Sequence, residues 1–228
     1  MKLLLTSAGV KNPSIHAALL SLLGKPIAEC QALAVPTAGY GHPWMKTEPA
    51  YSFLTGQSDT PMCELGWRSV GVLELTALPS LDAERWRSWV QAADFLLVNG
   101  GDALYLAHWM RESGLLDLLP SLTEAVWVGL SGGSMVMAPR IGEEFVGWRP
   151  PGSDDTAPVD DSALGVVDFA MFPHVGHPAL PSNTMDAAER WAAKLGTPAY
   201  AVDDDTAIVV VDGEVEVVSE GQWRRFDV

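Results

Sequence analysis

The sequence predicts an α/β fold in which a mostly parallel central sheet lies between two layers of helices. Short apolar runs that end in small or turn-forming residues recur at 3–5, 32–35, 70–73, 95–98 and 126–130. Segments with the hydrophobic spacing of helices separate the later runs, at 81–92 and 103–119. Strands buried on both faces of a parallel sheet are continuously apolar, and crossover helices cover them. The alternation therefore predicts a three-layer sandwich.

The second half of the chain has a different amino-acid composition and pattern. Residues 143–163 are rich in Gly, Pro and Asp, which predicts an irregular loop or hairpin. A strand is expected at 164–172, a helix at 181–195 and closing strands from residue 200 onward. Asp212-Gly213 separates the apolar runs 208–211 and 215–218, the favoured turn of a β-hairpin. We expect a single α/β domain over residues 1–228, with a β-hairpin near its C-terminal end.

The amino-acid composition disfavours several classes of binding partner for this protein. The chain has 14 Lys plus Arg against 29 Asp plus Glu, and the resulting net charge of −15 disfavours nucleic acid and anionic membrane surfaces. No apolar run reaches the ~20 residues of a membrane span, and the run after Met1 is too short for a signal peptide. Cys30 and Cys63 fit no zinc spacing and are expected to be reduced thiols. These features predict a cytoplasmic protein, and a homodimer is one option that the sequence leaves open.

The segment Gly129-Leu130-Ser131-Gly132-Gly133 matches the G-x-S-x-G pattern of a nucleophile elbow. It follows the apolar strand 126–130 and precedes a helix-like segment at 134–138, which is the setting that the elbow requires. The turn would hold the Ser131 side chain above the sheet edge, and the N–H of Gly132 would point at an oxyanion. The pattern favours Ser131 as a nucleophile over a Gly-Ser turn without chemistry.

A second strand end offers another oxyanion donor. Asn99-Gly100-Gly101-Asp102 follows the strand 95–98, and the N–H of Gly101 is the expected donor, with Asp102 a candidate for substrate contact. A serine nucleophile also needs a base. His174 follows the strand 164–172 through Pro173, at the carboxyl end of the sheet, so it is the expected base. His177 lies three residues later and is a candidate to line the pocket.

The acid that orients the base is left open by the spacing. Asp203, Asp204 and Asp205 follow the strand that begins at residue 200. The long loop holds six more candidates, which are Glu143, Glu144, Asp154, Asp155, Asp160 and Asp161. A run of three Asp residues is commonly a solvated turn, so residue type alone does not choose among them.

Taken together, five segments resemble one family over nearly the whole chain. They are Lys2-Leu3-Leu4-Leu5-Thr6-Ser7, Val98-Asn99-Gly100-Gly101-Asp102, Gly129-Leu130-Ser131-Gly132-Gly133-Ser134, Phe172-Pro173-His174 and Val202-Asp203-Asp204-Asp205-Thr206-Ala207. The chain resembles peptidase E (aspartyl dipeptidase) and cyanophycinase, serine peptidases whose fold is similar to that of class I glutamine amidotransferases. The resemblance implies Ser131 as nucleophile, His174 as base, and Gly101 and Gly132 as oxyanion donors. The serine at the position of the amidotransferase cysteine argues against glutaminase chemistry.

Two departures from that family affect the acid and the substrate. Peptidase E carries its acid in a Thr-Asn-Asp-Met-Pro stretch after the elbow helix, where this chain has Gly142-Glu143-Glu144-Phe145. Cyanophycinase places a Glu at the position of Asp204, so the resemblance favours Asp204, with Glu143, Glu144 or Asp203 as alternatives. The Arg with which peptidase E binds a substrate Asp aligns with Met185, about a turn before Arg190. Strict cleavage of Asp-X dipeptides is therefore doubtful.

These observations predict a serine peptidase that cleaves small peptides of the dipeptide class through an acyl-enzyme, without metal or organic cofactor. Two other functions share some of the same features. An α/β-hydrolase esterase has the same elbow with an acid before the histidine, which residues of the 143–161 region could supply. A binding protein that has kept the pocket without the chemistry is the second alternative.

Overall fold

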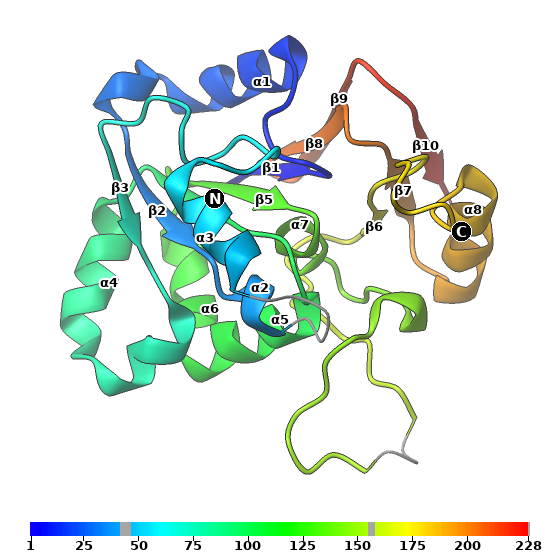
Figure 1. Ribbon diagram of the computed structural model, residues 1–228. Coiled ribbons are helices and arrows are strands. Elements are labelled where there is room, and N and C mark those ends of the chain that lie inside the picture. The colour runs from blue at the N-terminus through cyan, green and yellow to red at the C-terminus, as the bar shows by residue number, and fades with distance from the viewer. Residues whose placement is uncertain (42–46, 155–157, 228) are drawn as a thin grey trace.

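The computed structural model describes residues 1–41, 47–154 and 158–227. It contains a seven-stranded sheet with the order β3-β2-β4-β5-β1-β8-β9 (Figure 1). The first five strands in that order run parallel to one another, whereas β8 and β9 are antiparallel to their neighbours. The parallel strands are β1 (Lys2–Thr6), β2 (Gln31–Val35), β3 (Ser69–Val72), β4 (Phe95–Val98) and β5 (Val126–Leu130). The predicted mostly parallel sheet is thus confirmed.

Helices cover both faces of this sheet. Along β1, Leu3 and Leu5 pack with the cluster that includes α4, α5 and α6, whereas Leu4 packs with α1 on the other face. This alternation is the period of two that a strand imposes on its side chains. The helices are α1 (Pro13–Leu23), α2 (Ala38–Gly41), α3 (Glu48–Thr55), α4 (Ala83–Ala92), α5 (Ala103–Glu112), α6 (Leu115–Leu118), α7 (Gly132–Met135) and α8 (Met185–Leu195), with 3-10 helices at Ile27–Glu29, Leu75–Ser80, Leu119–Ser121 and Glu143–Phe145. None of the described helices combines the length and apolar character needed to cross a bilayer.

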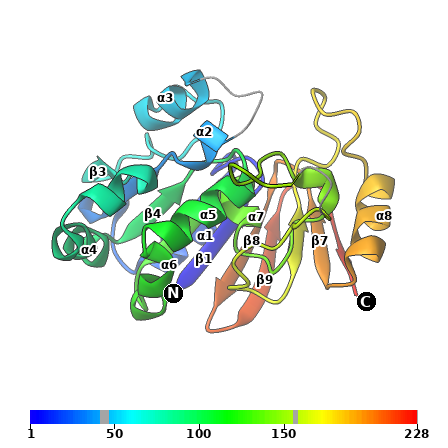
Figure 2. The same cartoon turned by 90° about the horizontal axis from the view of Figure 1, so that it is seen from below.

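The C-terminal part forms the expected hairpin and a second sheet. Strands β8 (Thr206–Val211) and β9 (Glu214–Ser219) pair across Asp212 and Gly213, whose φ angles of 52° and 84° suit a tight hairpin turn. Strands β6 (Ala170–Phe172), β7 (Ala199–Val202) and β10 (Trp223–Phe226) form a separate sheet with the order β10-β7-β6. Figure 2 shows β7 and α8 beside the β8–β9 end of the large sheet. This second sheet is not among the elements predicted from the sequence.

Two predicted elements differ in the structure. The strand expected at 164–172 forms only at its last three residues, because the N–H groups of Leu164 and Gly165 donate to Val136 O and Ala138 O, just after α7, instead of to a strand partner. The helix expected at 103–119 is divided, because Gly114 adopts a left-handed φ of 75° and ends the first part.

Candidate active site

Ser131 occupies the sharp turn between β5 and α7. Its φ of 48° and ψ of −112° lie in a region that residues with a side chain seldom adopt, so the turn is strained. The N–H of Ser131 donates to Thr6 O at 3.0 Å, which fixes the turn to the end of β1. Helix α7 begins directly at Gly132 and spans one turn, two residues earlier than expected. The elbow therefore presents the Ser131 hydroxyl at the carboxyl edge of the sheet.

The glycines around the elbow allow two backbone segments to meet. A Cβ at Gly132 would overlap the carbonyl oxygen of Gly101, and a Cβ at Gly129 would lie 2.5 Å from that of Gly133. Gly101 itself has a φ of 136°, which glycine adopts readily. The N–H groups of Gly101 and Gly132 have no acceptor within the described part of the chain. Both are available to an oxyanion formed beside Ser131.

His174 reaches Ser131 from the second sheet. It follows β6 through Pro173, and its Nε2 lies 2.9 Å from Ser131 Oγ. Its Nδ1 lies 2.6 Å from Oδ1 of Asp204, which follows β7. An ionised carboxylate only accepts hydrogen bonds, so with Asp204 ionised Nδ1 donates to it and Nε2 is left to accept from Ser131. The neighbouring strands β6 and β7 thus bring together two residues that are 30 positions apart in the sequence.

Asp204 is held in its charged form by its neighbours. Burial by itself raises the pKa of this carboxyl, but hydrogen bonds from His174 and Ser7 and the positive charge of Lys11 together lower it below its usual range. Ser7 Oγ donates to Asp204 Oδ1 at 3.0 Å. On the other carboxylate oxygen, His177 Nε2 lies at 3.7 Å and Lys11 Nζ at 4.0 Å. The carboxylate is therefore surrounded by donors and positive charge.

The alternative acids are engaged elsewhere. Asp203 accepts hydrogen bonds from the N–H groups of Asp205 and Gln222 and from the hydroxyl of Thr206. It therefore stabilises the turns that precede β8 and β10. Glu144 lines the cavity at Ser131 but pairs with Lys194 at 2.7 Å, and Glu143 lies beside a different cavity. In the structure the carboxylate that contacts His174 is that of Asp204, and not that of Glu143, Glu144 or Asp203. The esterase order requires an acid before the histidine, whereas Asp204, which contacts His174, follows it in the chain. Asp155, one of the acids of the 143–161 region, lies outside the described residues.

A cavity of about 520 Å³ opens over Ser131 and His174. Apolar side chains form much of its wall, among them Met135, Phe145 and Leu180. Asp102 also lines it, and its Oδ1 accepts the N–H groups of Leu104 and Tyr105 as the cap of α5. Within the described residues, no group of three or more His, Cys, Asp or Glu side chains is arranged to hold a metal ion.

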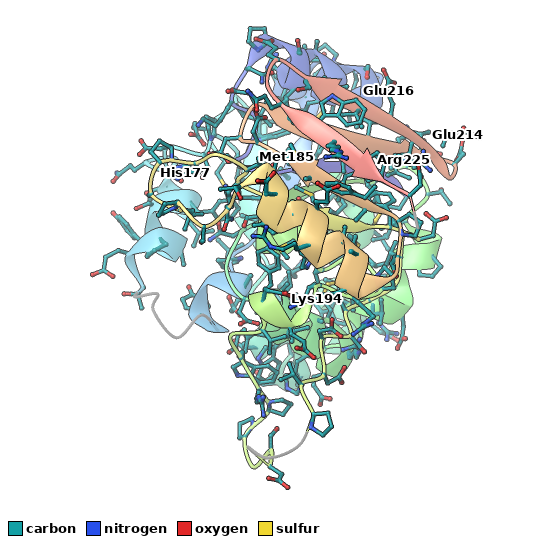
Figure 3. The ribbon with its side chains drawn as sticks, turned by 90° about the vertical axis from the view of Figure 1, so that its right-hand side faces the viewer. His177, Met185, Lys194, Glu214, Glu216 and Arg225 are labelled. Atoms are coloured by element: carbon teal, nitrogen blue, oxygen red, sulfur yellow. The ribbon has the colours of Figure 1, made fainter. Side chains whose placement is uncertain are left out.

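Three residues expected at the substrate lie outside this cavity. Figure 3 shows Met185 at the start of α8 and His177 in the preceding loop. Met185 packs against the core under α8, and Arg190 is exposed on the same helix. His177 faces Asp204 instead of the cavity. The prediction that His177, Met185 and Arg190 contact the substrate is not supported by their positions.

Ser7 and Lys11 were not among the candidates chosen from the sequence. Both follow β1, which lies between β5 and β8 in the large sheet. Because parallel neighbours end at the same edge, the end of β1 had to lie beside the end of β5, where Ser131 is. The polar pair Thr6-Ser7 at that strand end was the available signal.

The sequence was also compared with models of known protein families. The family model described as Peptidase family S51 matches residues 3–218, nearly the whole chain. The chain belongs to peptidase family S51. It is accordingly a serine-type peptidase, and the expected resemblance to peptidase E is confirmed.

Solved structures show the same fold at low sequence identity. A provisionally named peptidase E from Listeria monocytogenes EGD-e matches this S51 chain with a TM-score of 0.64 and 18% identity, covering 96% of this chain and 98% of its own. A peptidase from an acI-B1 Actinobacterium matches with a TM-score of 0.65 and 20% identity, over 97% and 88% of the two chains. The comparison with curated proteins found no significant match.

Proposed function

We propose that this S51 peptidase hydrolyses small peptides through an acyl-enzyme on Ser131. The observation that carries the proposal is the hydrogen-bonded chain from Ser131 Oγ to His174 Nε2 at 2.9 Å and from His174 Nδ1 to Asp204 Oδ1 at 2.6 Å. A hydroxyl, an imidazole and a carboxylate in this order form the arrangement that activates a serine for acyl transfer.

In the proposed mechanism, His174 Nε2 takes the proton of Ser131 while Oγ attacks the peptide carbonyl. The N–H groups of Gly101 and Gly132 stabilise the resulting oxyanion, which is commonly the largest electrostatic contribution in such sites. His174 then gives the proton to the leaving amine as the peptide bond breaks. A water molecule, deprotonated by His174, attacks the acyl-enzyme and releases the acid product and the serine.

The cavity supports a short substrate without an acidic side chain. Its volume of about 520 Å³ lies in the range of small-molecule sites. Among its described lining residues there is no Lys or Arg, whereas the carboxylates of Asp102 and Glu144 are present. A substrate Asp side chain would be poorly paired there. We therefore propose dipeptide-like substrates with neutral N-terminal side chains and not strict Asp-X cleavage.

A dipeptide panel tests this function at neutral pH with wild type and Ser131→Ala. We expect wild type alone to cleave dipeptides with apolar N-terminal residues, and Asp-X dipeptides to be cleaved more slowly, by about 10-fold or more, since the site lacks a partner for the carboxylate. A Ser131→Ala protein that retained full turnover would refute the nucleophile. Fast Asp-X cleavage would refute the substrate preference alone.

A cytoplasmic location and a homodimer are further proposals. The cytoplasmic location is supported by the two free cysteines, Cys30 and Cys63.

A further inference from the structure

We infer that Ser7 is a positioning residue that sets the geometry of His174 and Asp204 for the reaction at Ser131. The inference deepens the function proposed above and rests on it. Its basis is a set of hydrogen bonds made by one fully buried hydroxyl at the end of β1.

The hydroxyl of Ser7 makes hydrogen bonds to two different segments, as a donor to one and as an acceptor from the other. It donates to Asp204 Oδ1 at 3.0 Å and accepts the backbone N–H of His174 at 2.8 Å. His174 Nδ1 lies 3.3 Å from the same oxygen, but with Asp204 ionised its proton goes to the shorter contact with that residue. Ser7 therefore fixes the backbone of the proposed base and the carboxylate of the proposed acid relative to each other.

The backbone of His174 needs such a restraint. Its φ of 59° is positive, in a region that disfavours residues with a side chain, and such strain persists only where surrounding contacts over-determine it. The bond from its N–H to Ser7 Oγ is a contact of this kind. Without it, the imidazole could relax away from the 2.9 Å approach to Ser131 Oγ.

The neighbouring Thr6 completes the link to the elbow. Thr6 O accepts the N–H of Ser131 at 3.0 Å, and Thr6 Oγ1 donates to Gly129 O at 2.7 Å. The dipeptide Thr6-Ser7 thus bonds directly to the segments that carry Ser131, His174 and Asp204. These segments come from two different sheets, and the dipeptide Thr6-Ser7 is a contact that all of them share.

The test compares the rate and pH dependence of fluorophosphonate labelling of Ser131 in wild type and Ser7→Ala. We expect labelling to slow by about 10- to 100-fold, the loss associated with a hydrogen bond to a charged group. The acid limb of the rate should also move to higher pH, because the carboxylate of Asp204 loses a donor that favours its charged form. A simple loss of packing would not move that limb.

Thr37→Val is the matched control. Thr37 is equally buried, donates to Glu74 Oε1 at 3.0 Å and accepts the N–H of Leu75 at 3.1 Å, but it contacts neither His174 nor Asp204. We expect this variant to lose stability without a change in the pH profile of labelling. A shift of the profile in Thr37→Val equal to that in Ser7→Ala would overturn the inference.

Ser7→Cys keeps nearly the same volume with only a weak donor and acceptor, and it serves if Ser7→Ala does not fold. It should also be labelled more slowly than wild type. Labelling of Ser7→Cys at the wild-type rate and pH dependence would show that Ser7 only fills space. Absence of labelling at Ser131 in wild type would instead refute the proposed function itself, so the two failures are distinguishable.

Discussion

At the scale of single residues, the proposed mechanism requires Asp204 to remain charged beside His174. A carboxyl whose pKa is lowered by folding stabilises the protein above its unfolded pKa, and this contribution is lost as the pH falls through the folded value. For Asp204 the loss begins near the ordinary aspartate value of 3.8 and continues below it. Protonation would also remove the partner of His174 Nδ1.

Asp204→Asn tests both consequences. The amide leaves the geometry nearly intact but no longer stabilises a charged imidazole, so we expect turnover or labelling to fall by about 10³- to 10⁴-fold. Denaturant unfolding at a series of acidic pH values should show a shallower loss of stability in the variant than in wild type. Unchanged activity, or an identical pH dependence of unfolding, would contradict the role of Asp204.

At the scale of elements, α8 holds the small sheet against the loop that follows α7. Trp191 of α8 donates its indole N–H to Ile141 O at 2.9 Å and packs edge-on against Phe172, two residues before His174. Trp191→Phe keeps a ring but leaves the buried carbonyl of Ile141 without this donor. We expect a loss of about 1–3 kcal/mol in the free energy of unfolding, measured with guanidinium chloride.

The exposed Trp89 of α4 provides the control for this exchange, because Trp89→Phe removes no buried hydrogen bond. It should change the free energy of unfolding by less than about 0.5 kcal/mol. Equal losses in the two variants would mean that the indole bond of Trp191 does not support α8.

At the scale of the whole molecule, the charge of −15 makes the folded chain repel itself at neutral pH. Salt screens interactions between exposed charges over roughly 8–10 Å at physiological ionic strength. We expect the melting temperature to rise from low salt to about 0.15 M NaCl, by roughly 2–4 °C, the shift that ~1 kcal/mol produces in a chain of this size. Thermal melts in NaCl, with an uncharged osmolyte as control, measure it. A melting temperature that falls with salt would show that attractive pairs such as Lys25–Asp94 outweigh the repulsion.

Much of the fold could be predicted from local patterns. The apolar runs at Phe95–Val98 and Val126–Leu130 became strands with those same bounds, because continuous burial on both faces leaves a continuous apolar signature. Asp212-Gly213 suits a turn that needs two positive φ angles. Local patterns could not show that most of the strand expected at 164–172 does not form. The N–H groups of this segment bond to carbonyls just after α7, and that contact exists only in the folded chain.

The sequence by itself determined the large sheet, the elbow at Ser131 and the position of His174 at a strand end, since each depends on neighbours along the chain. The spacing left Asp203, Asp204 and Asp205 open, and only the resemblance favoured Asp204. The tertiary structure places Asp204 against His174 and Ser7 against both. Asp203 accepts hydrogen bonds from Thr206 and Gln222, whereas Asp204 contacts His174 and Ser7. The reason is that these choices depend on contacts between β1, the elbow and a second sheet, and residue spacing carries no information about the distance between separate sheets.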